Sequence, residues 1–408
     1  MKRSLLFVCL ALVAGLARPT LNAASPSLTP QGATELTKFL QQAVARGDVP
    51  GVVVAVVNRD GSIYNAAAGK SSTVRNTPVA NDTIFNIASM TKAVTSVAVM
   101  QLIERGKLKL DDPVGMYVPK FKDPLVISKF NGEDASYETR PAKRPITIRH
   151  LLTHTSGIGY AFASQTLSAI QQKTKKADYD LPLLFDPGES WAYGASTRVL
   201  GDVVAKISGQ PLDQYVQANI LGPLGMTDTS YLVPPAKYAR VAAVNAKDAG
   251  KYVERPVATP IPANVAGDGG LYSTASDYGR FLQMLLNGGH LGQARILDEK
   301  TVKMMFEPHT GNVVVQLQKS SNQALSKDFP LGALQDKWGL GFQLAHATAP
   351  NHRAAGSGTW AGIFNTHYFI DPTRNVAVVV MMQTLPFYDE ASMKVYAGVE
   401  DLVYRNLK

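Results

Sequence analysis

Residues 89–106 read SMTKAVTSVAVMQLIERG, and this stretch decides the fold. Most of its residues are good helix formers, and Gly106 provides a stop just after Glu104. Apolar residues recur so often that little polar surface is left on any side of the predicted helix. We therefore predict a central, largely buried helix from Ser89 to Glu104, with the other elements packed around it.

Strands are predicted toward both ends of the chain. In residues 51–69, β-branched runs flank an Asn-Arg-Asp-Gly sequence, whose Asp-Gly step is typical of a hairpin turn. Residues 366–383 repeat this pattern, with two apolar runs around a second turn. Helical spacing of apolar residues predicts a first helix that ends near Gly47 and a closing helix over 388–407.

The middle of the chain has a different character. Residues 108–262 contain proline-rich turns between short helical patterns, which predicts a mostly helical second domain. Residues 25–107 and 263–408 would form one α/β domain, with an antiparallel sheet built from both chain ends and flanked by helices. The predicted fold class is therefore α+β. A ligand is expected in the cleft between the two domains.

The first residues have the layout of a cleavable secretory signal. Two basic residues precede an apolar run over 5–17 that is too short to span a bilayer comfortably, and small residues follow it. We expect a signal peptide over residues 1–24 and a periplasmic or secreted protein with no stable membrane anchor. Cys9, the only cysteine of the sequence, lies in this segment, so no disulfide and no cysteine metal ligand is expected after cleavage.

Composition and spacing exclude several classes of function. The formal net charge is +9, but the basic residues are scattered, so we expect no nucleic-acid partner. His150 and His154 are four residues apart, but neither an HExxH pattern nor a third ligand accompanies them. We expect His154 to hold the turn that follows it. The glycine-rich stretches at 267–273 and 356–362 lack nucleotide-binding spacing. We therefore predict no metal and no cofactor.

Ser89 and Lys92 form a Ser-x-x-Lys pair, which has two interpretations. In the first, Ser89 caps the helix and Lys92 points into solvent. In the second, both side chains share one helix face, and a lysine desolvated by apolar neighbours activates the serine as a nucleophile. Tyr193 either relays a proton beside that lysine or is an ordinary half-buried tyrosine.

Six blocks of sequence carry a resemblance to a known family. In chain order they read IASMTK (87–92), ITIRHLLTHTSGI (146–158), DPGESWAYGAS (186–196), ILGPLGMTDT (220–229), GDGGLYSTASDYGRFLQMLLNGG (267–289) and GTWAGIFNTHYFIDP (358–372). Their order is similar to that in the serine β-lactamase-like hydrolases, which include class C β-lactamases and penicillin-binding proteins. Within this superfamily the chain most resembles the family VIII carboxylesterases. The resemblance implies a β-lactamase/transpeptidase-like fold.

The resemblance also implies catalytic roles for three residues. Ser89 matches the nucleophile of the family, Lys92 matches its lysine, and Tyr193 matches the tyrosine that begins the second motif. Either Lys92 or Tyr193 could be the immediate base, because the two would titrate as a coupled pair. The sequence leaves this choice open.

The third motif of the family, often Trp-x-Gly in these esterases, matches Trp360-Ala361-Gly362. The resemblance implies an oxyanion hole made by the backbone N–H groups of Ser89 and Ile363. Two departures from the β-lactamase pattern favour neutral esters over anionic amides. Ala195 replaces an asparagine that would hydrogen-bond the acyl side chain of a β-lactam, and Trp360 replaces a lysine that would help to hold the substrate carboxylate.

We therefore predict an exported serine carboxylesterase that cleaves small esters through an acyl-enzyme on Ser89. One alternative is a β-lactamase or a D-amino-acid-specific peptidase similar to D-alanyl-D-alanine carboxypeptidases, acting on β-lactams or D-amino-acid peptides. Another is a non-catalytic protein that binds a cell-wall ligand. We expect residues 313–337 to be a loop that borders the cleft. The sequence defines neither the path of this loop nor the oligomeric state.

Overall fold

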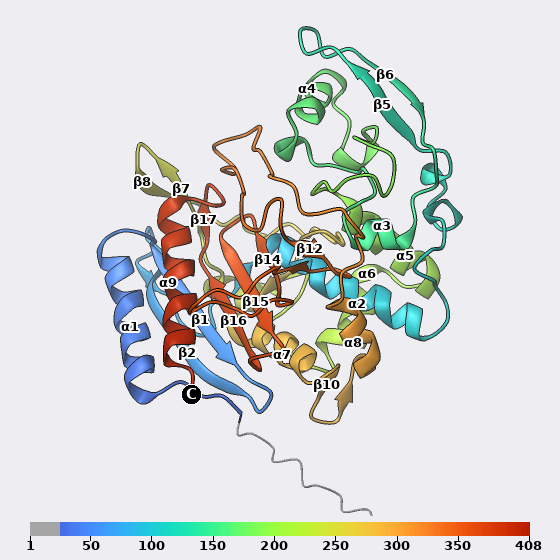
Figure 1. Ribbon diagram of the computed structural model, residues 1–408. Helices are drawn as coiled ribbons and strands as arrows, with labels where there is room; N and C mark the ends of the chain where they lie inside the picture. The colour runs from blue at the N-terminus through green and yellow to red at the C-terminus, as the bar shows by residue number, and fades with distance from the viewer. Residues whose placement is uncertain (1–24) are drawn as a thin grey trace, which may run out of the picture.

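The computed structural model describes residues 25–408, and the predicted signal peptide lies outside these residues. An eight-stranded sheet forms the centre of the molecule (Figure 1). Its strands, in spatial order, are β12 (Lys337–Trp338), β13 (Gln343–Leu344), β14 (Gly358–Gly362), β15 (Thr366–Asp371), β16 (Val376–Met381), β1 (Gly51–Val57), β2 (Ser62–Ser72) and β3 (Thr77–Pro78). All neighbouring pairs are antiparallel. The prediction of an α+β fold with an antiparallel sheet is confirmed.

The two ends of the chain meet inside this sheet. β1 pairs with β16, and Val54 lies opposite Val380. Both predicted hairpins are confirmed, because β1 is followed by its partner β2, and β15 by its partner β16. The side chain of Asn58 stabilises the first turn by accepting hydrogen bonds from the backbone N–H groups of Asp60 and Gly61. Every residue of β1, β15 and β16 is buried, which explains their unbroken apolar runs.

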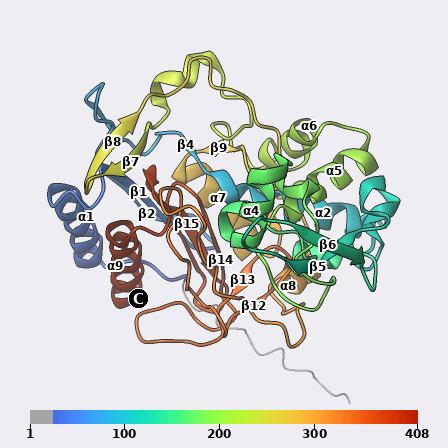
Figure 2. The same cartoon turned by 90° about the horizontal axis from the view of Figure 1, so that it is seen from above.

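Helices cover both faces of the sheet. α1 (Pro30–Ala45) and α9 (Glu390–Asn406) lie side by side on one face, as Figures 1 and 2 show, and confirm the two predicted terminal helices. α7 (Ala275–Leu286) packs against β1 and β16 on the other face. Val54 belongs to the apolar cluster under α1 and α9, whereas Val53 belongs to the cluster that includes α7. This alternation follows from the two-residue period of a strand.

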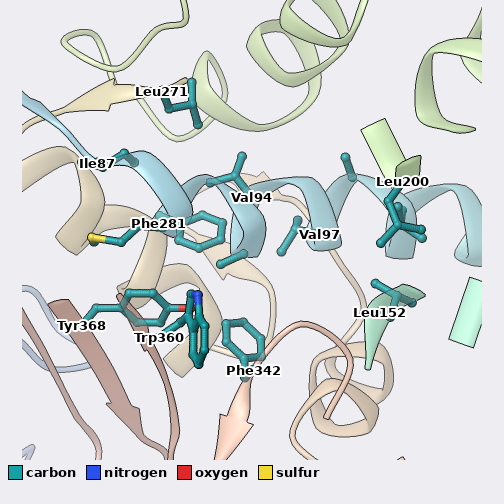
Figure 3. Close-up of a cluster of buried hydrophobic side chains, with 14 of the residues drawn as sticks. Ile87, Val94, Val97, Leu152, Leu200, Leu271, Phe281, Phe342, Trp360 and Tyr368 are labelled. Atoms are coloured by element: carbon teal, nitrogen blue, oxygen red, sulfur yellow. The ribbon is translucent and has the colours of Figure 1, made fainter. Parts of the chain in front are cut away.

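The helix α2 (Thr91–Glu104) lies in the interior, and every residue from Thr91 to Leu102 is buried. Figure 3 shows α2 with Trp360 and Tyr368 of the sheet on one side and Leu271 on the other. The prediction of a central, buried helix is confirmed. Its start was predicted at Ser89, but Ala88–Met90 form a 3₁₀ turn and the α-helix begins at Thr91.

Residues 108–262 contain α-helices and two β-hairpins. These elements are α3 (Ile148–Leu152), α4 (Gln165–Thr174), α5 (Ser196–Ser208), α6 (Leu212–Val216), the pair β5 (Leu125–Phe130) and β6 (Tyr137–Pro141), and the pair β7 (Val244–Asp248) and β8 (Lys251–Arg255). α5 packs against α2, and β7 pairs in parallel with β17 (Thr384–Leu385). The domain boundaries at 108 and 262 stay a prediction.

The remaining short elements connect these parts. They are β4 (Phe85–Asn86), which pairs with β9 (Tyr272–Ser273), β10 (His290–Leu291), which pairs with β11 (Ala294–Arg295), and α8 (Glu299–Met305). None of the helices within 25–408 has both the length and the apolar character needed to cross a membrane.

Candidate active site

Ser89 lies in a strained turn immediately before α2. Ala88 has a φ of 42°, in the left-handed region that costs a residue with a side chain about 1 to 3 kcal/mol. The side chain of Asn86 holds this turn, because its Oδ1 accepts a hydrogen bond of 3.0 Å from the Ala88 N–H. The N-cap residue of α2 is Met90, whose side chain makes no capping hydrogen bond. Ser89 is therefore not a helix cap, and that interpretation of the Ser-x-x-Lys pair is wrong.

Lys92 is buried, with only 3% of its surface exposed, so the interpretation as a solvated lysine is wrong too. Its Nζ atom lies 3.0 Å from Ser89 Oγ, 3.2 Å from Tyr160 Oη and 2.8 Å from the backbone oxygen of Asp268. An ammonium group has three N–H donors, and here each has an oxygen acceptor. Buried charge is tolerated only when it is paired or hydrogen-bonded in this way.

Tyr193 completes the group around Ser89. Its hydroxyl donates to Ser89 Oγ over 2.7 Å and accepts a hydrogen bond of 3.4 Å from Trp360 Nε1. The Lys92 ammonium lies 4.8 Å from the centre of the Tyr193 ring. The next residue, Gly194, lets this loop approach the chain before it, because a Cβ there would lie 1.9 Å from the carbonyl oxygen of Ile158. The structure thus brings Ser89, Lys92 and Tyr193 together, and their catalytic roles stay predictions.

Tyr160 and Asp268 belong to the same network and were missed in the sequence. Tyr160 Oη donates a short hydrogen bond of 2.5 Å to Asp268 Oδ2. Burial, and then the Asp268 carboxylate, raise the pKa of Tyr160 well above its ordinary value, so the phenol stays protonated. Tyr160 lies two residues after the 146–158 block, and Asp268 lies inside the 267–289 block, where no catalytic role was assigned to it. No spacing rule would have paired them.

His154 supports this site from behind. Its backbone oxygen accepts a hydrogen bond of 3.0 Å from the N–H of Ala192, which ties its turn to the Tyr193 loop. Its ring is buried against the rings of Trp191, Tyr193 and Trp338. Burial, and then the Lys92 cation, lower the pKa of His154 well below its ordinary value, so the ring is neutral.

His150 has a separate role in the structure. Its Nδ1 accepts a hydrogen bond of 3.1 Å from the N–H of Thr147 and closes a capping box at the start of α3. Within residues 25–408, no group of three or more His, Cys, Asp or Glu side chains is arranged to hold a metal ion.

The third motif forms part of β14 and lies directly beside Ser89. A Cβ on Gly362 would lie 2.4 Å from the backbone oxygen of Ile87, so only glycine allows this approach of the strand to the Ser89 turn. Trp360, Ala361, Gly362 and Ile363 all line the same cavity as Ser89. This contact places the backbone after the third motif beside the Ser89 turn. The oxyanion hole of Ser89 and Ile363 stays a prediction.

The cavity at Ser89 encloses about 240 Å³ and is mostly apolar. Aromatic rings dominate its wall, and Trp360 contacts both Tyr193 and Phe329, with ring centres 4.8 and 5.6 Å apart. The segment 313–337 contributes Gln318 and Phe329 to this wall, so the prediction that this segment borders the site is confirmed. The lining residues are Ser89, Tyr160, Phe162, Tyr193, Gln318, Leu325, Phe329, Trp360, Ala361, Gly362, Ile363 and Phe387.

Comparison with known proteins places this chain in a family. A match to the beta-lactamase family extends over residues 36–400. Lovastatin esterase of Penicillium rubens is 28% identical over 370 residues, which cover 85% of this chain and 91% of the relative. Esterase EstB of Burkholderia gladioli is 27% identical over 412 residues, which cover 91% of this chain and 95% of the relative.

The fold agrees with this assignment. The structure of the LovD6 mutant of simvastatin synthase from Aspergillus terreus is similar, with a TM-score of 0.80 and 27% identity, over 92% of this chain and 95% of that one. The resemblance inferred from the six sequence blocks is thereby confirmed, as is the β-lactamase/transpeptidase-like fold. The chain belongs to the beta-lactamase family and is an enzyme of the β-lactamase-like serine hydrolase superfamily.

Proposed function

We propose that this protein is a carboxylesterase that cleaves small esters through an acyl-enzyme on Ser89. The observation that carries the proposal is the position of Ser89 Oγ, which lies 3.0 Å from Lys92 Nζ and 2.7 Å from Tyr193 Oη at the wall of an apolar cavity. A serine needs such a base within hydrogen-bond distance to act as a nucleophile. Two relatives that match most of the chain are named as esterases, which supports the same reaction here.

In the mechanism that we propose, Lys92 first releases one proton of its ammonium to solvent and then, as the neutral amine, takes the proton of Ser89. As a neutral amine, Lys92 has two N–H donors for Tyr160 Oη and the Asp268 backbone oxygen, and its lone pair then faces the Ser89 hydroxyl. When Lys92 becomes an ammonium, its third N–H takes the direction of that lone pair. The proton is therefore transferred without any rearrangement of the oxygens around Nζ, which is the preorganisation that catalysis requires.

Tyr193 then connects Lys92 to the leaving group. Its O–H donates to Ser89 Oγ at rest and can pass its proton to the departing alkoxide. The Lys92 ammonium lies 4.8 Å from the centre of the Tyr193 ring, and once Ser89 Oγ is acylated it turns the N–H that faced Ser89 toward Tyr193 Oη and restores that proton. The acyl-enzyme and the free alcohol thus form with Lys92 and Tyr193 both neutral. Deacylation reverses the path. Tyr193 passes its proton to Lys92 and takes one from water, which attacks the acyl carbonyl, and the Lys92 ammonium then returns a proton to Ser89.

The character of the cavity supports esters with neutral acyl groups. Trp360 occupies the position where the resemblance would place a substrate-binding lysine, and its ring forms part of an aromatic wall. Ala195 is buried and is not among the residues that line the cavity. A β-lactamase or a D-amino-acid-specific peptidase is the alternative, since the family that the chain matches is named for β-lactamases.

One experiment tests these proposals together. The protein is treated with a nitrophenyl phosphonate ester and analysed by peptide mass spectrometry, and its rates on nitrophenyl butanoate and on a chromogenic cephalosporin are compared. We expect one phosphonyl group, on Ser89, no labelling of Lys92→Ala, and hydrolysis of the butanoate only. Ser168→Ala in α4 is the matched control and should label normally. Cephalosporin hydrolysis without ester hydrolysis would favour the alternative. Ester turnover at background level, unchanged by Ser89→Ala, would favour a non-catalytic binding protein.

We also propose that the protein is exported, to the periplasm or beyond. The support is the basic start, the apolar run over 5–17 and the small residues after it. Mass spectrometry of the protein recovered from the cells and from the medium tests this proposal.

A further inference from the structure

Among the described residues, the cavity at Ser89 has one polar side chain that the proposed reaction does not use. Gln318 is buried, with 7% of its surface exposed, and it lines the cavity. Its Oε1 atom is enclosed and has no hydrogen-bond partner within residues 25–408. The hydroxyls of Ser89, Tyr160 and Tyr193 are all engaged with one another, with Lys92 or with Asp268. The amide of Gln318 is thus free of the catalytic network.

The backbone holds Gln318 firmly in the wall of the cavity. It forms an antiparallel bridge with Phe329, in which Phe329 N–H donates to the Gln318 oxygen over 2.8 Å and Gln318 N–H donates to the Phe329 oxygen over 3.4 Å. Residues paired in this way project to the same side. The Phe329 ring in turn packs against the rings of Trp360 and Phe387, with centres 5.6 and 5.4 Å apart. The amide is therefore presented inside an aromatic wall.

A buried amide without a partner destabilises a folded protein, and each such group needs an explanation. A ligand that hydrogen-bonds to the amide once Oε1 has turned toward the cavity is one explanation. Rotation of the amide about its last bond exchanges Oε1 and Nε2, so Gln318 can offer the cavity either an acceptor or donors. A hydroxyl group both donates and accepts, and it is the smallest group that satisfies either orientation.

We infer that the acyl group of the substrate carries a hydroxyl that hydrogen-bonds to Gln318. This inference rests on the proposed esterase function. The acyl group is the part that stays bonded to Ser89 while the alcohol departs, so it is the part that the cavity must hold. A series of contacts links the two residues: Ser89 contacts Tyr193, the Tyr193 ring packs against Trp360, Trp360 packs against Phe329, and Phe329 is bridged to Gln318. The hydroxyl therefore lies several carbon atoms beyond the scissile carbonyl, with an apolar chain between them.

Matched pairs of esters test this inference. The pairs are nitrophenyl 6-hydroxyhexanoate with the heptanoate and nitrophenyl 8-hydroxyoctanoate with the nonanoate, in which a methyl group replaces each hydroxyl. In the native protein we expect kcat/KM to be about fivefold higher for the hydroxylated member of at least one pair, the value of one hydrogen bond. In Gln318→Met the preference should reverse, because the hydroxyl would lose its water without gaining a partner.

Gln316→Met is the matched control, since the Gln316 amide donates to the Val314 oxygen over 2.9 Å and does not line the cavity. It should keep the native preference. Equal rates within both pairs, or a preference that survives in Gln318→Met, would overturn the inference about Gln318. If the esters without a hydroxyl are still cleaved, the esterase proposal is unaffected by that result. If no ester is cleaved and Ser89 is not labelled by a phosphonate, both proposals fall.

Discussion

Tyr160→Phe removes one hydroxyl from the network and tests how Lys92 is held. The change deletes the acceptor that lies 3.2 Å from Lys92 Nζ and the donor that lies 2.5 Å from Asp268 Oδ2. A hydrogen bond to a charged group contributes about 1.5 to 3 kcal/mol, and about 1.4 kcal/mol corresponds to a factor of ten in rate. Since Ser89 Oγ and the Asp268 backbone oxygen still hold Lys92, we expect kcat to fall about 10- to 100-fold, less than in Lys92→Ala.

The assay separates this effect from general damage. Hydrolysis of nitrophenyl butanoate gives kcat and KM, and the rate of phosphonylation of Ser89 reports nucleophile activation alone. We expect kcat and the phosphonylation rate to fall together while KM changes little, because Tyr160 acts on Lys92 rather than on the ester. Tyr238→Phe is the control, since that hydroxyl makes no hydrogen bond to another described residue and is outside the cavity. It should have near-native rates.

A double-mutant cycle with Asp268→Asn adds the decisive comparison. If Asp268 acts on Lys92 through the Tyr160 hydroxyl, the double variant should be no slower than Tyr160→Phe alone. Additive losses would show that the two residues act independently. A Tyr160→Phe rate equal to that of Tyr238→Phe would refute the proposed role of Tyr160 in positioning Lys92.

Three further predictions concern stability, pH and export. Gly194→Ala places a Cβ 1.9 Å from the Ile158 oxygen, so we expect it to lower the unfolding free energy, measured by urea titration, by at least about 2 kcal/mol and to reduce activity. Gly132→Ala is the control, because its Cβ would have only one neighbour, at 3.9 Å, and it should change neither quantity. Burial lowers the pKa of His150 to about 4, below the 6.5 of the unfolded chain. The contribution of the neutral His150 ring to the unfolding free energy is therefore fully present above pH 6.5 and is lost as pH falls toward 4. Between pH 7 and pH 5, the unfolding free energy of His150→Gln should fall by less than that of the native protein, as measured from unfolding curves at the two pH values. Mass spectrometry of the exported protein should show a chain that begins near residue 25, and an uncleaved chain retained in the cytoplasm would contradict this.

The features that the sequence predicted correctly are those with a local cause. α2 is predicted because its apolar residues occupy every side of the helix, and the hairpins because turn residues separate two β-branched runs. The closing helix α9 is predicted because its apolar residues recur at helical spacing and mark its buried face. In each case one continuous segment holds the whole signal.

The features that the sequence missed depend on contacts between distant segments or on backbone geometry. Ser89 lies in a 3₁₀ turn because Ala88 takes a left-handed conformation, which alanine rarely adopts and no pattern predicts. Tyr160 and Asp268 are 108 residues apart in the sequence, and only the folded chain brings them into contact with each other and with Lys92. The burial of Lys92, which decides between the two interpretations of the Ser-x-x-Lys pair, also comes from tertiary packing.

The motifs that we propose to perform the reaction and the wall that we propose to select the substrate are held in the fold in different ways. Gly362 packs against the Ile87 oxygen, so the third motif cannot move without moving the backbone beside Ser89. Gly194 packs against the Ile158 oxygen, so the Tyr193 loop cannot move without the segment that leads to Tyr160. The wall formed by Gln318 and Phe329 lies in a segment with little regular structure, held by an isolated bridge. Substitutions there can change the acyl group that fits without disturbing the nucleophile. This separation explains why sequence motifs identify the chemistry of Ser89, whereas the substrate has to be inferred from the unpaired amide of Gln318.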